Sequence, residues 1–211
     1  MENPKITDRI EQVNVDLKKA RRTLTSINGK FTERYFNHVL SLIPEKIRRE
    51  KREKLKAYDG LNNIFNLAYE MLSWEVHRAL IKAKLEPYLG FLHSTQYWKP
   101  SLVCDFQELY RHLIDDFLIQ YCQDLRKKDY IVKTEDMTGK KKGKRVYLND
   151  MQTRDLMKQL NKFFESYVEV LRMRVGKRQT IETLINEEAL LLAKFLRGER
   201  KIWKPRLDLI H

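Results

Sequence analysis

The sequence predicts an all-α protein. Glycine and proline are scarce, at 7 and 5 of 211 residues, whereas a sheet needs a turn after every short strand. Apolar residues recur at steps of three and four in several segments, which is the spacing of one helix face. No segment is convincing as a strand, although Arg145 to Leu148 could form a short one. We expect an amphipathic helix at residues 1–27, a helical domain at residues 28–198 and an irregular tail at residues 199–211.

The first 27 residues carry a narrow apolar stripe with charged residues on the other faces. The members of the stripe are Ile6, Ile10, Val13, Leu17, Ala20, Leu24 and Ile27. Their alternating steps of four and three form a heptad seam, which predicts an amphipathic helix. This helix either packs against the main body or pairs with the same helix of a second subunit. Gly29 interrupts the pattern, so we expect a second helix from Phe31 that ends near Pro44.

The middle of the chain supplies the core and a loop. Residues 45–56 form a dense charged run, which is either a solvated face or a strip that contacts phosphate. Asp59–Gly60 marks a turn, and residues 61–81 are too densely apolar for a surface helix, so we expect the central core helix there. A loop bounded by prolines holds His93, and a long helix should follow over residues 101–127.

The last third contains basic connectors between helices. Residues 133–145 are polar and end in a cluster of lysines, so we interpret this segment as a mobile basic loop. Asn149 or Asp150 could cap the next helix, which should reach about Val168, and Thr180 could cap the last one.

The charge balance predicts a polyanionic partner. Lys and Arg outnumber Asp and Glu by 42 to 29, which gives a net charge of +13. Nucleic acid is the commonest polyanion for such a protein, although a basic thermophilic or ribosome-associated protein would have a similar charge. Cys104 and Cys122 lie in apolar stretches, where we expect buried reduced thiols. The N-terminus has no apolar signal region and no uncharged run could span a membrane, so we expect a cytoplasmic protein without membrane contact.

A loop imidazole and two carboxylates form the candidate site. Asp105 and Glu108 lie three residues apart, so they should share a helix face that Arg111 extends, with His93 opposite them. Oxygen ligands suit Mg²⁺ and Mn²⁺, and Mn²⁺ tolerates an imidazole better. By spacing alone, a surface ion-pair ladder and a hydrogen-bonding histidine are the commoner explanation.

The same region resembles the signature of the CRISPR-associated spacer integrase family. Residues 85–93 read LEPYLGFLH and residues 99–108 read KPSLVCDFQE, which are similar to the family's "GLxPxLGFLH" loop and "RPSLxxDLxEEFR" helix start. The resemblance extends to residues 59–69 and 181–193 and covers roughly residues 27–196. It implies a helical integrase catalytic domain. Family members usually also carry an N-terminal β-rich domain for dimerisation, and here a charged helical segment precedes Asn28.

The resemblance also implies a ligand set. His93 matches the family's metal-binding histidine, Glu108 the later carboxylate, and Asp105 a carboxylate that is a ligand or supports one. The upstream glutamate of the family aligns with Asn28, whose amide oxygen can still touch a metal but brings no negative charge. We therefore expect Mg²⁺ or Mn²⁺ to be held by His93, Glu108 and Asn28, and more weakly than in the family.

The implied reaction is insertion of short DNA spacers into a CRISPR array, by attack of a DNA 3′-hydroxyl on a phosphodiester. The expected partners are double-stranded spacer and repeat DNA, a homo-oligomer (dimer or tetramer), and possibly a second adaptation protein. The cations expected to bind DNA phosphate are Arg111, Lys140, Lys141, Lys142, Lys144, Arg145, Lys177 and Arg178. Two alternatives remain: a catalytically weakened DNA-binding subunit of the same fold, and a basic helical scaffold without metal.

Overall fold

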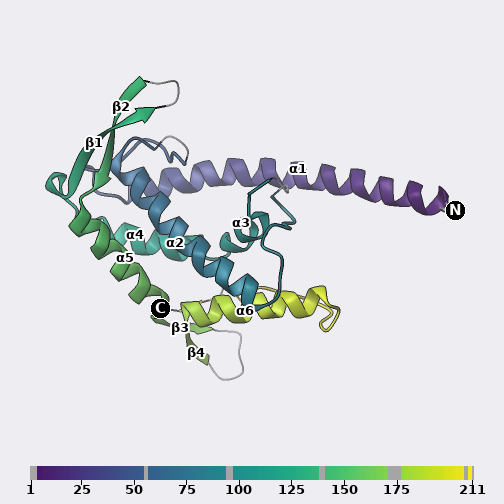
Figure 1. The fold of residues 1–211 in the computed structure, drawn as a ribbon. Helices are drawn as coiled ribbons and strands as arrows, with labels where there is room; N and C mark the ends of the chain where they lie inside the picture. The colour runs from purple at the N-terminus through teal and green to yellow at the C-terminus, as the bar shows by residue number, and fades with distance from the viewer. Residues whose placement is uncertain are drawn as a thin grey trace.

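The computed structural model describes residues 4–54, 57–93, 97–137, 141–170, 177–206 and 209–210. Helices make up most of the described chain, as predicted, and Figure 1 shows them gathered around α2 (Gly60–Lys82). Two small sheets are also present, so the expectation of a strictly all-α fold is wrong. No helix among the described residues is long and apolar enough to cross a membrane.

Helix α1 (Pro4–Ser41) is continuous through Gly29, which corrects the prediction of two helices. A single glycine costs a helix only about 1 kcal/mol and leaves its backbone hydrogen bonds in place. Among residues 15–41, whose side chains the structure describes, α1 is buried at its C-terminal end, through Phe36, Val39 and Leu40. The N-terminal part projects beyond the rest of the chain (Figure 1), and its stripe residues Leu17 and Leu24 are exposed. The predicted boundary at residues 27/28 falls within this helix, and the domain division stays a prediction.

Helix α2 is the central core helix, as predicted. Asp59 caps its N-terminus by accepting a hydrogen bond from the backbone N–H of Asn62 at 2.9 Å. The helix packs against α3 (Ser101–Gln107), α4 (Arg111–Tyr121), α5 (Asp150–Phe164) and α6 (Ile181–Leu196). Its residues Phe65, Ala68, Leu72 and Val76 are fully buried.

The single helix predicted over residues 101–127 is instead two. A turn at residues 108–110 separates α3 from α4, and Glu108 stands at the C-cap of α3. After α4, a 3-10 turn at Lys127–Asp129 leads into the first sheet. Asp105 therefore lies inside α3, whereas Glu108 is the C-cap residue that directly follows its last helical residue.

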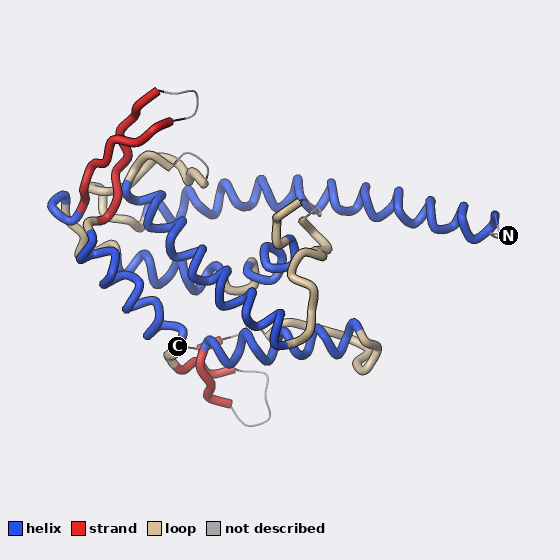
Figure 2. The backbone as a smooth tube through the Cα atoms, in the orientation of Figure 1, coloured by secondary structure: helices blue, strands red, loops and turns tan. Residues whose placement is uncertain are grey.

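The segment interpreted as a mobile basic loop is a β-hairpin. Strand β1 (Tyr130–Met137) pairs antiparallel with β2 (Lys141–Leu148), and the hairpin projects from the body (Figure 2). One face is held by side-chain contacts: the Tyr147 hydroxyl donates to Glu135 at 3.0 Å, and Arg145 lies 3.4 Å from the same carboxylate. The interpretation as a loop rested on the many lysines of this segment, and composition does not show which residues pair across two strands.

The C-terminal third confirms both predicted caps. Asn149 caps α5 and Thr180 caps α6, each by a side-chain oxygen that accepts a backbone N–H. Between these helices, β3 (Tyr167–Val170) and β4 (Lys177–Thr180) pair, and β5 (Leu209–Ile210) adds to β3. The tail thus includes a strand at residues 209–210, whereas residues 199–206 are irregular as predicted.

The tail also packs onto α3 and α6. Trp203 stacks on Phe106 with ring centroids 6.2 Å apart and an angle of 9° between the planes. Its indole N–H donates to Glu188 at 3.2 Å, and Arg206 pairs with Glu188 and Glu187. Phe106 lies on α3, so these contacts connect the tail to the helix that carries Asp105.

Candidate functional site

Asp105 shapes the loop that holds His93. Its two carboxylate oxygens accept the backbone N–H groups of Phe91, Leu92 and His93 at 2.6, 2.9 and 2.8 Å. Gly90 makes this close approach possible, because an added Cβ would lie 2.8 Å from an Asp105 oxygen and 2.7 Å from Ser101 Cβ. The sequence predicted that Asp105 and Glu108 share one face, but Asp105 turns toward the loop.

Asp105 also fixes the orientation of the His93 ring. The imidazole Nδ1 lies 2.6 Å from Asp105 Oδ1, and the carboxylate is fully buried. Burial opposes ionisation, but the hydrogen bonds from His93, Leu92 and Phe91 outweigh it and hold the pKa of Asp105 below its ordinary 3.8. An ionised carboxylate only accepts hydrogen bonds, so Nδ1 carries the proton. In the neutral imidazole this tautomer has its lone pair on Nε2, which is the arrangement of a metal-binding histidine supported by a carboxylate.

Asn28 is shared by two neighbouring clefts. The first, of about 680 Å³, is lined by His93 and Leu92 of the loop and by residues of α1. The second, of about 320 Å³, is lined by Glu108 and Arg111 and by the next turns of α1. Asn28 is the one lining residue common to both. The three predicted ligands therefore line two neighbouring clefts beside α1: His93 lines the first, Glu108 the second, and Asn28 of α1 lines both.

The side chains of His93, Glu108 and Asn28 offer only weak ligands for a divalent metal ion. Within the described parts of the chain, no three His, Cys, Asp or Glu side chains are grouped to hold a metal ion. An imidazole, a carboxylate and the neutral amide of Asn28 remain, and these are acceptable but not strong ligands for Mn²⁺ or Mg²⁺. Arg111 further lowers the available charge, because its guanidinium lies 2.7 Å from the Glu108 carboxylate.

Arg111 is an internal residue. It is 9% exposed, and its guanidinium lies over the rings of Tyr69 and Phe36 at 4.6 and 5.5 Å. Burial disfavours its charge, but Tyr69 and Glu108 more than compensate and raise the pKa of Arg111. The binding of DNA phosphate by Arg111 stays a prediction, and the structure places this residue in the wall of the Glu108 cleft.

A buried carboxylate that the sequence analysis missed supports the Glu108 cleft. Asp115 is fully buried and accepts hydrogen bonds from the hydroxyls of Tyr35, at 2.7 Å, and Tyr69. Burial raises the pKa of Asp115 despite these hydrogen bonds. Tyr35 lines the cleft beside Glu108, so Asp115 holds part of its wall in place.

Basic residues of α1 were missed as well. The His93 cleft is also lined by four cationic side chains, and none of the described residues that line it is acidic. They are Lys18, Arg21, Arg22 and Lys99. The Arg21 Nε donates to the carbonyl of Phe91 at 3.0 Å, which joins α1 to the loop. The spacing of Lys18, Arg22 and Thr25 on one helix face was a signal available in the sequence.

The other predicted DNA-binding cations lie on separate elements. Lys142, Lys144 and Arg145 are on β2, and Arg178 of β4 lies over the ring of Tyr167 at 5.2 Å. The side chains of Lys141 and Lys177, and the whole of Lys140, lie outside the described residues. Figure 1 shows the hairpin and β4 well apart, so the basic residues of β2 and of β4 form separate regions.

Comparison with known proteins identifies the relatives of this chain. The family model "CRISPR associated protein Cas1" matches residues 2–162. The "CRISPR-associated endonuclease Cas1 3" of Thermus thermophilus is 26% identical over 210 residues, covering 94% of this chain and 58% of that protein. This chain spans about half the length of the curated relatives it matches.

Solved structures share the fold. A casposase bound to integration product has a TM-score of 0.73 at 21% identity, covering 90% of this chain and 53% of that chain. A Cas6-RT-Cas1–Cas2 complex has the same TM-score at 20% identity, covering 90% of this chain and 20% of that chain. Since the family model matches most of the sequence and the fold agrees, this chain belongs to the CRISPR associated protein Cas1 family.

Proposed function

We propose that this chain is a metal-dependent DNA integrase that inserts short DNA spacers into a CRISPR array, with a weakened metal site. The observation that carries the proposal is the position of Asn28, where the clefts of His93 and Glu108 meet. His93 Nε2, the Glu108 carboxylate and the Asn28 amide oxygen would hold Mn²⁺ or Mg²⁺. When bound, the metal supplies positive charge at the phosphate that is attacked.

The side chains around the metal ligands have defined tasks in this proposal. Asp105 keeps the proton on Nδ1 of His93, so that Nε2 faces the cleft as a ligand. Lys18, Arg22 and Lys99 bind the phosphates of the DNA strand that enters the His93 cleft. The 3′-hydroxyl of the incoming DNA would attack a phosphodiester of the repeat while these groups hold both strands. The new P–O bond forms as the bond from phosphorus to the 3′-oxygen of the repeat breaks; the attacking hydroxyl loses its proton to solvent and the leaving oxygen gains one.

The fold neighbours support the choice of partners. One is a casposase bound to integration product and another is a complex that contains Cas1 and Cas2. We propose double-stranded DNA as substrate and a second adaptation protein as partner. Joining at two DNA ends needs at least two active sites, so we also propose a homo-oligomer, a dimer or a tetramer.

The joining reaction tests the site directly. A labelled short duplex and a supercoiled plasmid, incubated with the protein and Mn²⁺, should give a joined product that His93→Ala abolishes. Asn28→Glu should raise the rate by about 10-fold or more, because it restores a charged ligand. His77→Ala removes an exposed histidine of α2 and should leave the rate unchanged. Joining that survives His93→Ala would contradict the proposed site.

The neutral amide of Asn28 also favours a second candidate, a subunit that holds DNA but joins it poorly. In that case the parent protein gives no product, and Asn28→Glu restores joining. A basic helical scaffold without metal would behave differently from both. Its melting temperature would not change across a Mn²⁺ titration, and Asn28→Glu would give no joining.

Salt dependence tests the cationic cleft independently of chemistry. The double variant Lys18→Glu/Arg22→Glu should weaken the binding of duplex or single-stranded DNA. It should also reduce the magnitude of the slope of log K against log salt by about 1 to 2, because binding with fewer phosphate contacts releases fewer counterions from the DNA. Fluorescence anisotropy at several salt concentrations measures the slope. Lys127→Glu/Lys128→Glu, in the 3-10 turn, is the matched control for charge alone. Equal changes in both double variants would show that the cleft has no special role.

A further inference from the structure

An apolar stripe on α1 is exposed to solvent. Because α1 continues through Gly29, its heptad spacing extends beyond Ile27 to Phe31. Leu17 is 61% exposed and Phe31 is 66% exposed, and the residues between them at this spacing are exposed as well. Aligned apolar side chains on a projecting helix indicate a surface that another helix covers. The members of this surface, here called the α1 stripe, are Leu17, Ala20, Leu24, Ile27 and Phe31.

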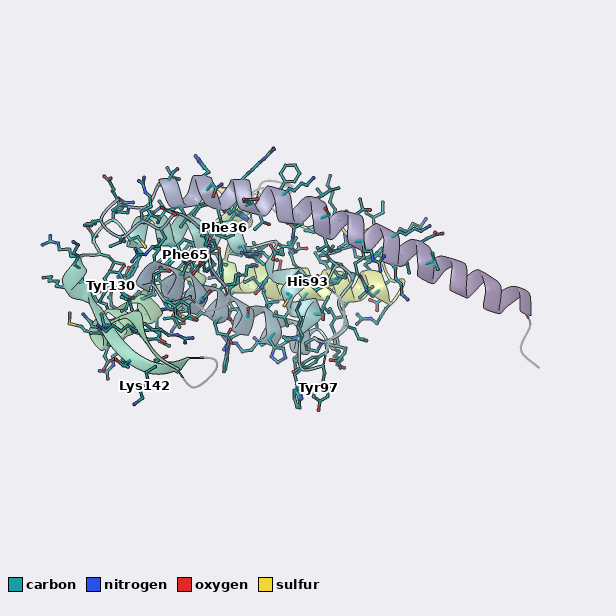
Figure 3. The ribbon with its side chains drawn as sticks, turned by 90° about the horizontal axis from the view of Figure 1, so that it is seen from above. Phe36, Phe65, His93, Tyr97, Tyr130 and Lys142 are labelled. Carbon is teal, nitrogen blue, oxygen red and sulfur yellow. The ribbon has the colours of Figure 1, made fainter. Side chains whose placement is uncertain are left out.

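The body of the chain packs against a different face of α1. The buried residues Phe36, Val39 and Leu40 attach the helix to the core. At about 100° per residue, their mean direction is turned by about 130° around the helix axis from that of the α1 stripe. Figure 1 and Figure 3, which are views at right angles, both show α1 along an edge of the molecule with the body mainly to one side. The contacts within one chain therefore leave the stripe open to a second molecule.

The charges beside the α1 stripe favour an identical helix that runs in the same direction. In a parallel coiled coil, the g residue of one heptad lies opposite the e residue five positions later in the partner. Asp16 precedes Leu17 directly and is such a g residue, and Arg21 is the e residue five positions later. Asp16 of each chain would thus lie opposite Arg21 of the partner subunit, which gives two ion pairs. The bond from Arg21 Nε to the carbonyl of Phe91 leaves the two NH₂ groups of the guanidinium to meet the carboxylate.

The next pairs at this spacing contain no like charges. Thr23 would lie opposite Asn28, and Lys30 opposite Tyr35. An antiparallel arrangement that aligns the two stripes would place Asp16 and Arg21 on opposite sides of the seam, where they form no ion pair. Charge complementarity therefore selects a second copy of this chain, in parallel, as the occupant of the stripe.

We propose that α1 pairs with α1 of a second copy of this chain in a parallel two-stranded coiled coil, with the α1 stripe as its core. This inference rests on the proposed function, because it supplies the contact of the homo-oligomer proposed there. Asn28 directly follows Ile27, so it lies at the edge of the seam. The pair would carry one His93 cleft on each side of a shared coiled coil, and so hold together the two sites that joining at two DNA ends requires.

Sedimentation equilibrium of the whole chain, without DNA or metal, tests the pairing. The parent should show a reversible monomer–dimer equilibrium, because a seam of about three heptads is short. Leu17→Lys/Leu24→Lys should weaken dimerisation by at least about 100-fold, since it puts charges into the core of the seam. Leu190→Lys/Leu196→Lys changes two exposed leucines of α6 and is the matched control, which should dimerise as the parent does. A parent that stays monomeric at every concentration, or dimers that survive the α1 double variant, would overturn the proposal.

A charge exchange tests the direction of the two helices. Asp16→Arg sets an arginine against Arg21, and Arg21→Asp sets an aspartate against Asp16, so each variant alone should dimerise about tenfold more weakly. An equal mixture of the two variants should form heterodimers with the affinity of the parent, detected by native mass spectrometry, because every pair again joins opposite charges. This recovery is independent of the contact between Arg21 and Phe91, which the mixture does not restore. Unchanged pairing of each variant alone, or a mixture without heterodimers, would refute the parallel pair.

A cysteine reports the register of the two helices. In the parallel pair Ile27 faces Ile27 of the partner subunit, so Ile27→Cys should form an interchain disulfide under mild oxidation. Glu33→Cys, at an exposed position of α1 that is turned away from the seam, is the matched control and should stay monomeric on a non-reducing gel. The parent keeps Cys104 and Cys122 and shows the background. Equal crosslinking at both positions would assign the contact to random collision and overturn the register.

No arm of this test depends on DNA joining. A chain that dimerises through α1 but joins no DNA would support the pairing and contradict the proposed function. A chain that joins DNA but does not pair through α1 would do the reverse.

Discussion

Asp105→Asn will lower the free energy of unfolding by about 3 kcal/mol. Each carboxylate oxygen accepts two hydrogen bonds, Oδ1 from the backbone and ring of His93 and Oδ2 from the backbone of Phe91 and Leu92. Asparagine has one oxygen and one NH₂ group. If the NH₂ group faces Phe91 and Leu92, two backbone donors lose their acceptor; if it faces His93, the backbone N–H loses its acceptor and the ring must change tautomer to keep its hydrogen bond. Chemical denaturation of parent and variant measures the difference.

The same substitution has a signature in pH. The folded-state pKa of Asp105 is held below its ordinary 3.8, so this group contributes stability that is present above about pH 4 and is lost as the pH falls through the folded value. The asparagine variant should therefore lose less stability than the parent on acidification below pH 4. Asp116→Asn, at an exposed position of α4, is the control and should leave both the stability and its pH dependence unchanged. An Asp105→Asn protein as stable as the parent would show that the loop is held by other contacts.

Arg206→Ala will destabilise the protein by about 3 to 5 kcal/mol, although Arg206 lies near the C-terminus. Its guanidinium pairs with Glu188, which is fully buried in α6, and with Glu187 at 3.1 Å. Without the arginine, the Glu188 carboxylate is left in the core with only the indole N–H of Trp203, at 3.2 Å. A buried charge without its partner is far more costly than the loss of a surface ion pair.

A double-mutant cycle separates this cost from lost packing. Adding Glu188→Gln to Arg206→Ala removes the unpaired charge and should recover part of the stability, as measured by thermal unfolding. Arg197→Ala breaks an exposed pair with Glu199 and should leave the melting temperature unchanged. If Glu188→Gln worsens the Arg206→Ala variant, the carboxylate is not the source of the instability.

Helices α2, α5 and α6 were predictable because their signals are local, whereas the continuity of α1 and the break between α3 and α4 were not predicted. The dense apolar run of α2 and the caps at Asn149 and Thr180 are read from neighbouring residues, and the structure confirms them. The β-hairpin was missed because its lysines suggested a solvated loop, whereas its stability comes from pairs such as Glu135 and Arg145 on opposite strands. Such pairs become visible only when the register of the strands is known.

The candidate site was predictable only as a set of residue types. The match to a family motif gave His93, Glu108 and Asn28, and the structure places all three beside α1. The orientation of Asp105 was not predictable from helix spacing, because its partners lie 12 to 14 residues earlier in the chain. For the same reason, local spacing could not show that Arg111 lies over Tyr69, or that Asp115 holds Tyr35.

Because α1 is one unbroken helix, a movement of its N-terminal part also moves Asn28 in the proposed metal site. The helix is buried from Phe36 onward and is also joined to the His93 loop by the hydrogen bond from Arg21 to Phe91; Asn28 lies about 12 Å before Phe36, and Pro4 about 48 Å before it. If the helix pivots at Phe36 by about 5°, its tip moves about 4 Å and the amide of Asn28 about 1 Å. A displacement of 1 Å is enough to change a reaction rate by about 100-fold. A molecule that binds the N-terminal turns of α1 would therefore change the distance between the Asn28 amide and the His93 imidazole without contacting either side chain.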